Sequence, residues 1–165
     1  MNIFFGFGAN REVAMIQAIT GKSPQIVGEA TLRGYQLCIQ SLKDIPTHGH
    51  NPRRLLRKAW GSDFRSYVIR KEKSSSVGGT VFRISRYDRK LLDMWELVPK
   101  DWQYSTVVRV TLANGKTIRA RTQTLPIEQQ CKKVTSVSYA SWLMPEEDFV
   151  DIASRSAVRY KLVVF

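Results

Sequence analysis

The chain has 165 residues, the length of one ordinary domain with a hydrophobic core. Its 26 Lys and Arg residues outnumber its 14 Asp and Glu residues, which gives a formal net charge of +12 and attracts anions from small carboxylates to nucleic acid. No run of about twenty apolar residues is present, and the apolar stretch Ile3 to Phe7 is too short for a signal peptide and lacks a basic leader. We therefore expect a single domain over residues 1–165, with no membrane span, in the cytoplasm.

The metal-binding and disulfide signals in the sequence are weak. Cys38 and Cys131 lie far apart without CxxC spacing, and one candidate pair does not make a disulfide framework, so we expect two free thiols. His48 and His50 flank a glycine in a loop without Cys or carboxylates at ligand spacing, and no metal site is expected there.

The first elements follow from β-prone residues and then from helical spacing. Residues 2–7 predict a strand that Gly8, Ala9 and Asn10 interrupt. Val13, Ile16 and Ile19 then recur at helical spacing, so a short helix is expected to start near Asn10, a good N-cap residue type. Gly21 and Pro24 end it.

The middle of the chain predicts two strand regions joined by a loop. "ATLRGYQLCIQSL" is typical of a strand with a glycine bend, and "KDIPTHGHNPRR" of a loop. "RRLLRKAWG" fits either a basic helical turn or a covered loop. "FRSYVIRKEK" and "TVFRIS" are β-prone, and the intervening "SSSVGG" predicts a flexible break.

The remaining segments predict helices on both sides of a hairpin. "RYDRKLLDMWELVP" has Leu91, Leu92 and Trp95 at helical spacing before Pro99. "STVVRVTL" and "TIRARTQTL" flank Asn114-Gly115, a strong hairpin turn signal. "EEDFVDIASRSAVRY" predicts a helix and "KLVVF" a final strand. This mixed order favours an α+β fold, a small twisted β-barrel or curved sheet with flanking helices, over a doubly wound sheet.

Few residues are candidates for chemistry. No GxSxG elbow, HExxH pair, Walker loop or dinucleotide GxGxxG is present, and Cys38 beside Leu37 and Ile39 resembles an inert buried thiol. Glu96 lies among Leu92, Trp95, Leu97 and other apolar residues at the end of a packing helix. Such a glutamate can point outward or pair with an arginine. Alternatively it is partly desolvated, with a pKa raised toward neutrality, as a general base requires.

Three motifs in order resemble the γ-glutamylcyclotransferase-like family, which includes the AIG2-like proteins. Phe7-Gly8-Ala9-Asn10 resembles the Tyr-Gly-Ser-Asn loop that follows the family's first strand. "EATLRGYQL" resembles its Ala-x-Leu-x-Gly-Tyr-x-Leu strand, and "VGGTVFRIS" with "LLDMWE" its Gly-x-Val-Tyr strand and Leu-Asp-x-Tyr-Glu segment. The resemblance runs from about Asn2 to Leu125, and the family glutamate falls on Glu96.

The resemblance implies a small β-barrel enzyme that cyclises a γ-glutamyl group to 5-oxoproline and releases an amine. Glu96 would be the catalytic base and then the acid. Phe7, Gly8, Ala9 and Asn10 would bind the substrate, together with Tyr104, on which a family tyrosine falls. No cofactor or metal is implied. Phe7 and Ala9 replace the usual Tyr and Ser.

Two other functions stay open from the sequence. One is a protein that binds nucleic acid or an acidic partner, because basic residues adjoin Trp60 in "NPRRLLRKAW" and Tyr67 lies before "RKEK". The other is a catalytically silent member of the same fold.

Overall fold

A computed structural model describes residues 2–98 and 102–134. In this part of the chain the strands are β1 (Asn2–Gly6), β2 (Gln25–Ser41), β3 (Arg65–Ile84), β4 (Tyr104–Leu112), β5 (Thr117–Thr124) and β6 (Lys132–Lys133). The α-helices are α1 (Val13–Thr20), α2 (Pro52–Trp60) and α3 (Arg86–Trp95), and two short 3₁₀ helices are η1 (Gly8–Arg11) and η2 (Leu42–Asp44). The predicted C-terminal helix and strand lie outside the described residues.

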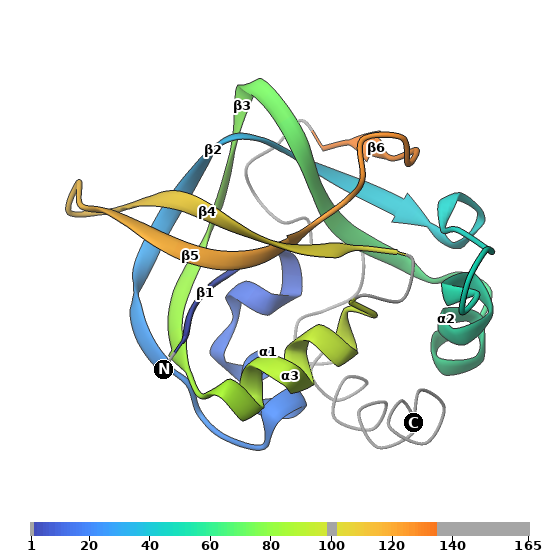
Figure 1. Ribbon diagram of the computed structural model, residues 1–165, viewed down its shortest axis with the longest axis horizontal. Helices are drawn as coiled ribbons and strands as arrows, with labels where there is room; N and C mark the ends of the chain where they lie inside the picture. The colour runs from blue at the N-terminus through green and yellow to red at the C-terminus, as the bar shows by residue number, and fades with distance from the viewer. Residues whose placement is uncertain (1, 99–101, 135–165) are drawn as a thin grey trace.

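The described strands form one sheet that closes on itself (Figure 1). Their order is β3-β1-β5-β4-β2-β6, and β3 also pairs with β2. Strands β1 to β5 therefore complete a barrel, with β6 added beside β2. All these pairings are antiparallel except the short parallel contact of β1 with β5. The predicted barrel with flanking helices is confirmed.

The two longest strands, β2 and β3, pair along most of their length. The register runs from Gln25 opposite Arg83 to Ser41 opposite Arg65, with bulges near Gly28 and Gly34. The segment "SSSVGG" is part of this ladder, since Ser76 lies opposite Arg33 and Val77 opposite Leu32. The prediction of a flexible break there was wrong, because pairing with β2 satisfies a backbone whose own residues have little strand preference.

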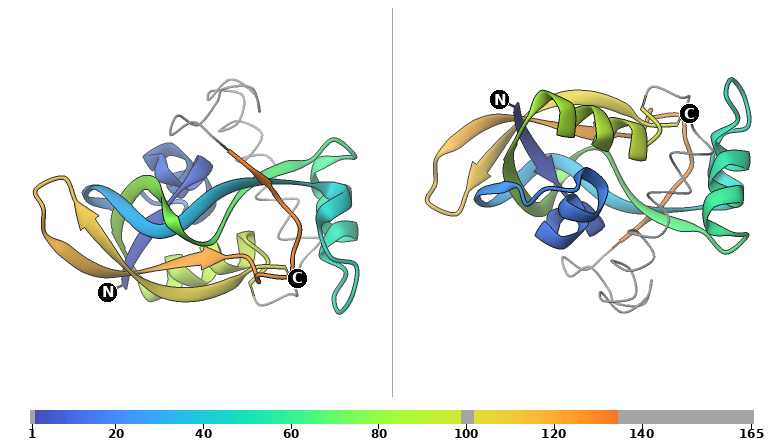
Figure 2. Two further views of the ribbon diagram at one scale, coloured as in Figure 1. Left: turned by 90° about the horizontal axis from the view of Figure 1, so that it is seen from above. Right: turned by 90° about the horizontal axis from the view of Figure 1, so that it is seen from below.

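The apolar residues of β1 serve two cores. Phe5 belongs to the barrel interior with Val81 and Leu32. Phe4 points to the other face and packs with Ile16 of α1 and Leu92 of α3. Helices α1 and α3 lie together beside the barrel, whereas α2 lies away from them, at one end of the molecule (Figure 2). Burial on both faces explains why β1 is continuously apolar rather than alternating.

The first helix begins later than expected. Residues Gly8–Arg11 form η1, and α1 starts at Val13 with Glu12 as its N-cap residue. Asn10 is therefore not a helix cap, and its side chain is directed elsewhere, as described below. Gly21, in a left-handed conformation at φ 77°, ends α1, which confirms that boundary.

The later elements follow local signals. The segment "PRRLLRKAW" is helical as α2, capped by Asn51, whose side chain accepts a hydrogen bond from the Arg54 N–H. A capping box of Ser85 and Asp88 starts α3. Strands β4 and β5 form the predicted hairpin, with Gly115 at φ 82° in its turn.

The two cysteines meet in space although they are far apart in sequence. Both thiols are free, as expected. They hydrogen-bond to each other beside the β2–β6 pairing, which raises the pKa of buried Cys38 and lowers the pKa of Cys131. The positive charges of Arg70 and Lys133 also lower the pKa of Cys131, so Cys131 has the more readily ionised thiol.

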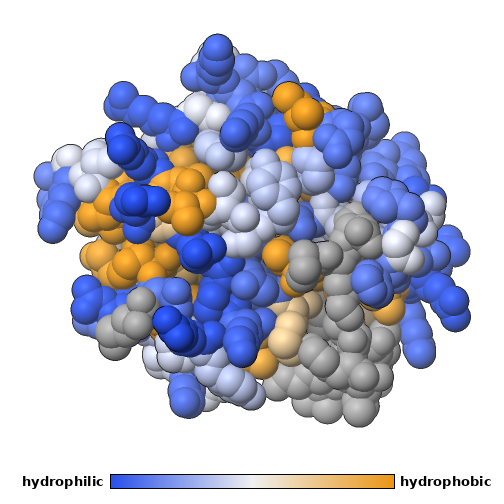
Figure 3. Space-filling model, in the orientation of Figure 1, coloured by the Kyte–Doolittle hydropathy of each residue, from blue (hydrophilic) through white to orange (hydrophobic). Residues whose placement is uncertain are grey.

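The visible face is mainly hydrophilic, and its hydrophobic side chains gather chiefly at the left of the view, where charged side chains interrupt them (Figure 3). On the outer side of the β4–β5 hairpin, exposed Arg109 lies directly opposite exposed Arg119. Like charges in that arrangement weaken a strand pair, so the basic surface has a cost in stability.

None of the helices in the described residues has the length and apolar character needed to cross a membrane.

Two adjacent glycines of β3 provide a matched test of barrel closure. A Cβ at Gly79 would collide with the Gly6 carbonyl oxygen and lie 2.7 Å from Phe5 Cζ, whereas a Cβ at Gly78 meets nothing within 4 Å. Gly79→Ala is expected to lower the free energy of unfolding by about 2 kcal/mol or more, and Gly78→Ala to change it by less than about 1 kcal/mol. Urea unfolding of both variants measures this, and equal effects would contradict the packing at β1.

Candidate active site

The loop after β1 is tightly folded around glycines. Gly8 has φ 58°, and a Cβ on it would lie 2.9 Å from Tyr67 Cβ. A Cβ on Gly6 would collide with the Asn10 carbonyl oxygen. The Asn10 N–H donates to the Phe7 carbonyl oxygen at 3.1 Å, while the first N–H groups of a 3₁₀ turn have no acceptor within it. The backbone of η1 thus has donors available to a ligand.

The end of α3 places Glu96. Glu96 is the C-cap residue, and its N–H donates to the Leu92 carbonyl oxygen at 3.0 Å. The next residue, Leu97, takes a left-handed conformation at φ 52°, which is unfavourable for a residue other than glycine. The Leu97 side chain is fully buried, and this packing offsets the strain. The Val98 N–H donates to the Asp93 carbonyl oxygen at 2.8 Å, a bond that closes the end of α3 around Glu96.

The Glu96 carboxyl is partly buried and accepts two side-chain hydrogen bonds. Asn10 Nδ2 donates to Oε1 at 2.5 Å, and Gln103 Nε2 donates to Oε2 at 2.8 Å. Burial raises the pKa of Glu96 to about 7, the two amide hydrogen bonds oppose that shift, and the nearby Asp93 charge adds to it. Glu96 therefore exchanges a proton near neutral pH, which is the range in which one carboxyl can act as both base and acid.

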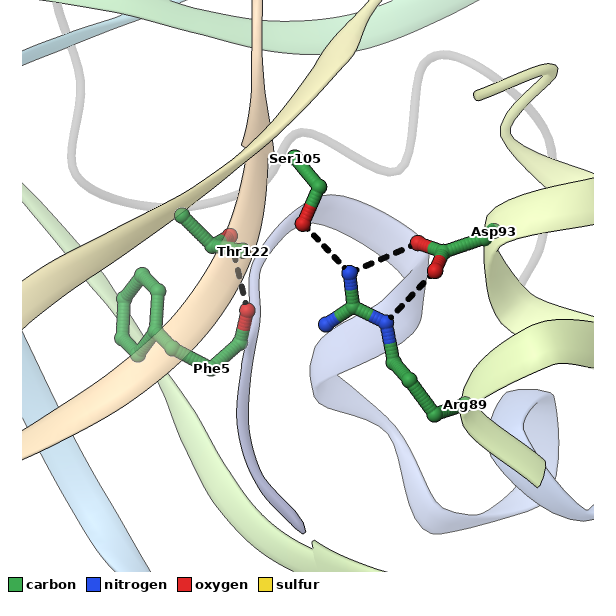
Figure 4. Close-up of polar contacts among 5 residues, drawn as sticks. All are labelled: Phe5, Arg89, Asp93, Ser105 and Thr122. Carbon is green, nitrogen blue, oxygen red and sulfur yellow. Dashed lines mark hydrogen bonds and ion pairs between the residues drawn. The ribbon is translucent and has the colours of Figure 1, made fainter. Parts of the chain in front are cut away.

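A buried arginine of α3 hydrogen-bonds to the start of β4 (Figure 4). Arg89 donates to both carboxylate oxygens of Asp93, at 2.9 and 2.7 Å, and to Ser105 Oγ at 2.6 Å. The same figure shows Thr122 Oγ1 donating to the Phe5 carbonyl oxygen, which ties β5 to β1. The bidentate pair with Asp93 lies within α3 and fixes the guanidinium, and the hydrogen bond to Ser105 then connects the helix that precedes Glu96 to β4.

A pocket of about 540 Å³ opens next to Glu96. It is lined by loop residues at one side and by large aromatic residues elsewhere. The lining residues are Phe7, Gly8, Ala9, Asn10, Met15, Leu56, Trp60, Asp63, Phe64, Arg65, Ser66, Tyr67, Trp95, Glu96 and Trp102. This volume is ordinary for a small-molecule site.

The structure brings most of the predicted site residues together. The loop Phe7 to Asn10 and Glu96 line the same pocket, although 86 positions separate Asn10 from Glu96. Tyr104 is not among the lining residues; it starts β4, and 40% of it is exposed.

Sequence reasoning missed Gln103, the residue just before Tyr104. Gln103 is 3% exposed and contacts Glu96 directly. A lone glutamine before a strand has no motif that would distinguish it from a surface residue. Only its burial, which depends on how α3 packs near β4, could reveal its role.

The described residues contain no group of three or more His, Cys, Asp or Glu side chains that could hold a metal ion. Beside the Phe7–Asn10 loop the polar groups of the pocket are the Glu96 carboxyl, the Asn10 amide and backbone N–H groups, and Asp63, Arg65 and Ser66 add further polar side chains to the lining. This set suits proton transfer and recognition of a polar, anionic ligand.

The family of this chain follows from comparison with known proteins. A family model described as Gamma-glutamyl cyclotransferase, AIG2-like, matches residues 4–144, and the chain belongs to this family. The comparison with curated proteins finds no match.

Solved structures are similar in fold. A structure titled Gamma-glutamyl cyclotransferase is 17% identical, with 97% of this chain and 86% of that chain covered and a TM-score of 0.63. An uncharacterised Homo sapiens protein has the same identity, coverage and TM-score. An Arabidopsis thaliana protein is 15% identical, with 91% and 86% covered and a TM-score of 0.58. At these identities the likenesses establish the fold.

The raised pKa of Glu96 makes stability depend on pH. Because the pKa rises from 4.5 to about 7, the folded protein binds this proton more tightly than the unfolded chain. The resulting stability is fully present below pH 4.5 and is lost as pH rises to about 7. As pH rises from 4.5 to 7, the unfolding free energy of the wild type should fall by roughly 2–3 kcal/mol relative to that of Glu96→Gln, which has no carboxyl to ionise at this position.

Urea unfolding from pH 4.5 to 8 measures this shift. The exposed Glu128 provides the control, since Glu128→Gln should follow the wild-type pH dependence. A pH-independent difference between Glu96→Gln and wild type would show that Glu96 titrates normally.

Proposed function

We propose that this protein is a γ-glutamyl cyclotransferase, which converts a γ-glutamyl amine or amino acid into 5-oxoproline and the free amine. The observation that carries the proposal is the Glu96 carboxyl, which has a pKa raised to about 7, lines the same pocket as the Phe7–Asn10 loop and accepts a hydrogen bond from Asn10 of that loop. Membership of the family and the shared barrel support it.

Glu96 performs both proton transfers in this mechanism. Its carboxylate takes a proton from the substrate α-amino group, whose nitrogen attacks the γ-carbonyl carbon and forms the ring C–N bond. The C–N bond to the leaving amine then breaks, and Glu96 returns the proton to the departing nitrogen. One carboxyl with a pKa near the working pH is effective in both directions.

The loop and the two amides support this carboxyl. The N–H groups at the start of η1 bind the α-carboxylate of the γ-glutamyl group, because glycine backbone lets a ligand approach closely. Asn10 and Gln103 donate to the two Glu96 oxygens and so fix its orientation toward the substrate. Ala9 provides a backbone N–H in place of the family serine, and Phe7 provides an apolar ring in place of the tyrosine.

The first test is release of 5-oxoproline from a panel of γ-glutamyl amino acids, γ-glutamyl amines and glutathione. Glu96→Gln should lower kcat by about 100-fold or more, as loss of a general base does, while Glu128→Gln should have no effect. The 5-oxoproline released by the wild type and by both variants is measured by chromatography. Equal background from wild type and Glu96→Gln on every substrate would overturn the proposal, and salt-dependent binding of oligonucleotides would then favour the nucleic-acid alternative.

The pH dependence tests the role of the amides. Since Glu96 must be ionised to accept a proton, kcat/KM should rise with pH through about 7. The hydrogen bond from Gln103 lowers the pKa of Glu96, so Gln103→Leu should move this rise to higher pH. A profile that is unchanged in Gln103→Leu would show that another group controls the reaction.

A further inference from the structure

Four aromatic side chains form a continuous wall of the pocket beside Glu96. They are Trp60 at the end of α2, Phe64 before β3, Trp95 at the end of α3 and Trp102 before β4. The ring centroids of Trp60 and Trp95 are 5.4 Å apart and edge-on, those of Trp60 and Phe64 are 6.0 Å apart, and those of Phe64 and Trp102 are 6.3 Å apart. We call these four residues the aromatic wall.

The cyclisation chemistry does not use the aromatic wall. A γ-glutamyl group is small and polar, and its polar groups are satisfied by the loop and Glu96. A cavity of about 540 Å³ extends beyond what that group fills, because cavities of this size hold drug-sized molecules. The wall therefore lies where the other half of the substrate, the leaving amine, has to be placed.

Core packing alone does not account for these rings. Trp102 is buried, and its indole N–H donates to Gln40 Oε1 at 2.7 Å, which is a structural role. Trp60, Phe64 and Trp95 are only partly buried and keep apolar surface at the pocket. When a ligand covers apolar surface of this kind, water is displaced and binding becomes more favourable.

The charges beside the wall favour an uncharged group. Asp63 and Arg65 flank Phe64, so one acidic and one basic side chain offset each other beside the wall, while Glu96, the other acidic lining residue, is assigned to the γ-glutamyl group. Arg65 is the only Lys or Arg among the lining residues described. A site for a polyamine would need an excess of acidic groups, and a site for a phosphate an excess of basic groups.

We propose that the aromatic wall binds the leaving amine and makes the enzyme selective for γ-glutamyl compounds whose amine has an aromatic or large apolar side chain. This inference rests on the proposed function, since it assigns the second half of that substrate. Trp60, Phe64 and Trp95 are the specificity residues.

A matched pair of substrates tests the selectivity. γ-Glutamylphenylalanine and γ-glutamylalanine differ only by a phenyl ring, so kcat/KM measured through 5-oxoproline release isolates the contribution of the wall. We expect γ-glutamylphenylalanine to be preferred by about 10-fold or more, the range that apolar pockets achieve. Equal values, or a preference for γ-glutamylalanine, would overturn the inference.

Two variants assign the preference to the wall. Trp60→Leu and Phe64→Leu keep an apolar side chain but remove a ring, and each should lower the ratio of the two kcat/KM values several-fold. Tyr87, an aromatic residue of α3 that is 65% exposed and does not line the pocket, is the control. Tyr87→Ala should keep the wild-type ratio. If all three variants keep it, the wall does not select the substrate.

Binding to Glu96→Gln separates failure of this inference from failure of the proposed function. Calorimetric titration of that variant with both compounds measures affinity without turnover. Preferred binding of γ-glutamylphenylalanine with no turnover by wild type would contradict the proposed reaction but keep the aromatic subsite. Turnover without any preference would contradict only the subsite. If neither compound binds, both are wrong.

Discussion

The carboxyl group of Glu96 accepts hydrogen bonds from Asn10 and Gln103, and these two contacts join three distant parts of the chain. Asn10 belongs to η1 after the first strand, Glu96 caps α3, and Gln103 immediately precedes β4. A partly desolvated carboxylate is stable only where donors are aimed at it. The packing of all three segments is therefore coupled to the position and the protonation state of one side chain.

The barrel supplies the rigidity that this arrangement needs. Pairing of β1 with β3 and with β5 fixes the point where the glycine loop leaves the sheet. Gly79 must lack a side chain because a Cβ there would collide with the Gly6 carbonyl oxygen, and Gly6 must lack one because its Cβ would collide with the Asn10 carbonyl oxygen. Arg89 connects α3, the helix that precedes Glu96, to Ser105 at the start of β4. Sites held by packed strands and helices keep their geometry better than sites built from loops alone.

The pocket has two kinds of lining, a polar part made by the Phe7–Asn10 loop with Glu96 and an apolar part made by the aromatic wall. The loop and the carboxyl provide hydrogen bonds and proton transfer, which suit the γ-glutamyl group proposed as substrate. The aromatic wall provides apolar area, which can distinguish one leaving amine from another. Trp60 and Phe64 come from α2 and the chain that enters β3, so this half of the wall can change without a change in the segments that hold Glu96, whereas Trp95 and Trp102 adjoin Glu96 and Gln103.

Local patterns were enough to predict the Asn114-Gly115 hairpin, the packing helix that ends near Glu96 and the glycine loop, since each depends on neighbours within a few residues. The order of three motifs then indicated the family and the barrel. Gln103, the aromatic wall and the continuous strand through "SSSVGG" were not predictable in this way. Each depends on residues far away in sequence: Gln103 on the end of α3, the wall on four separate segments, and the strand on its partner β2. Burial and strand pairing arise only when the barrel closes, and that closure decided which polar groups face Glu96 and how far its pKa rises.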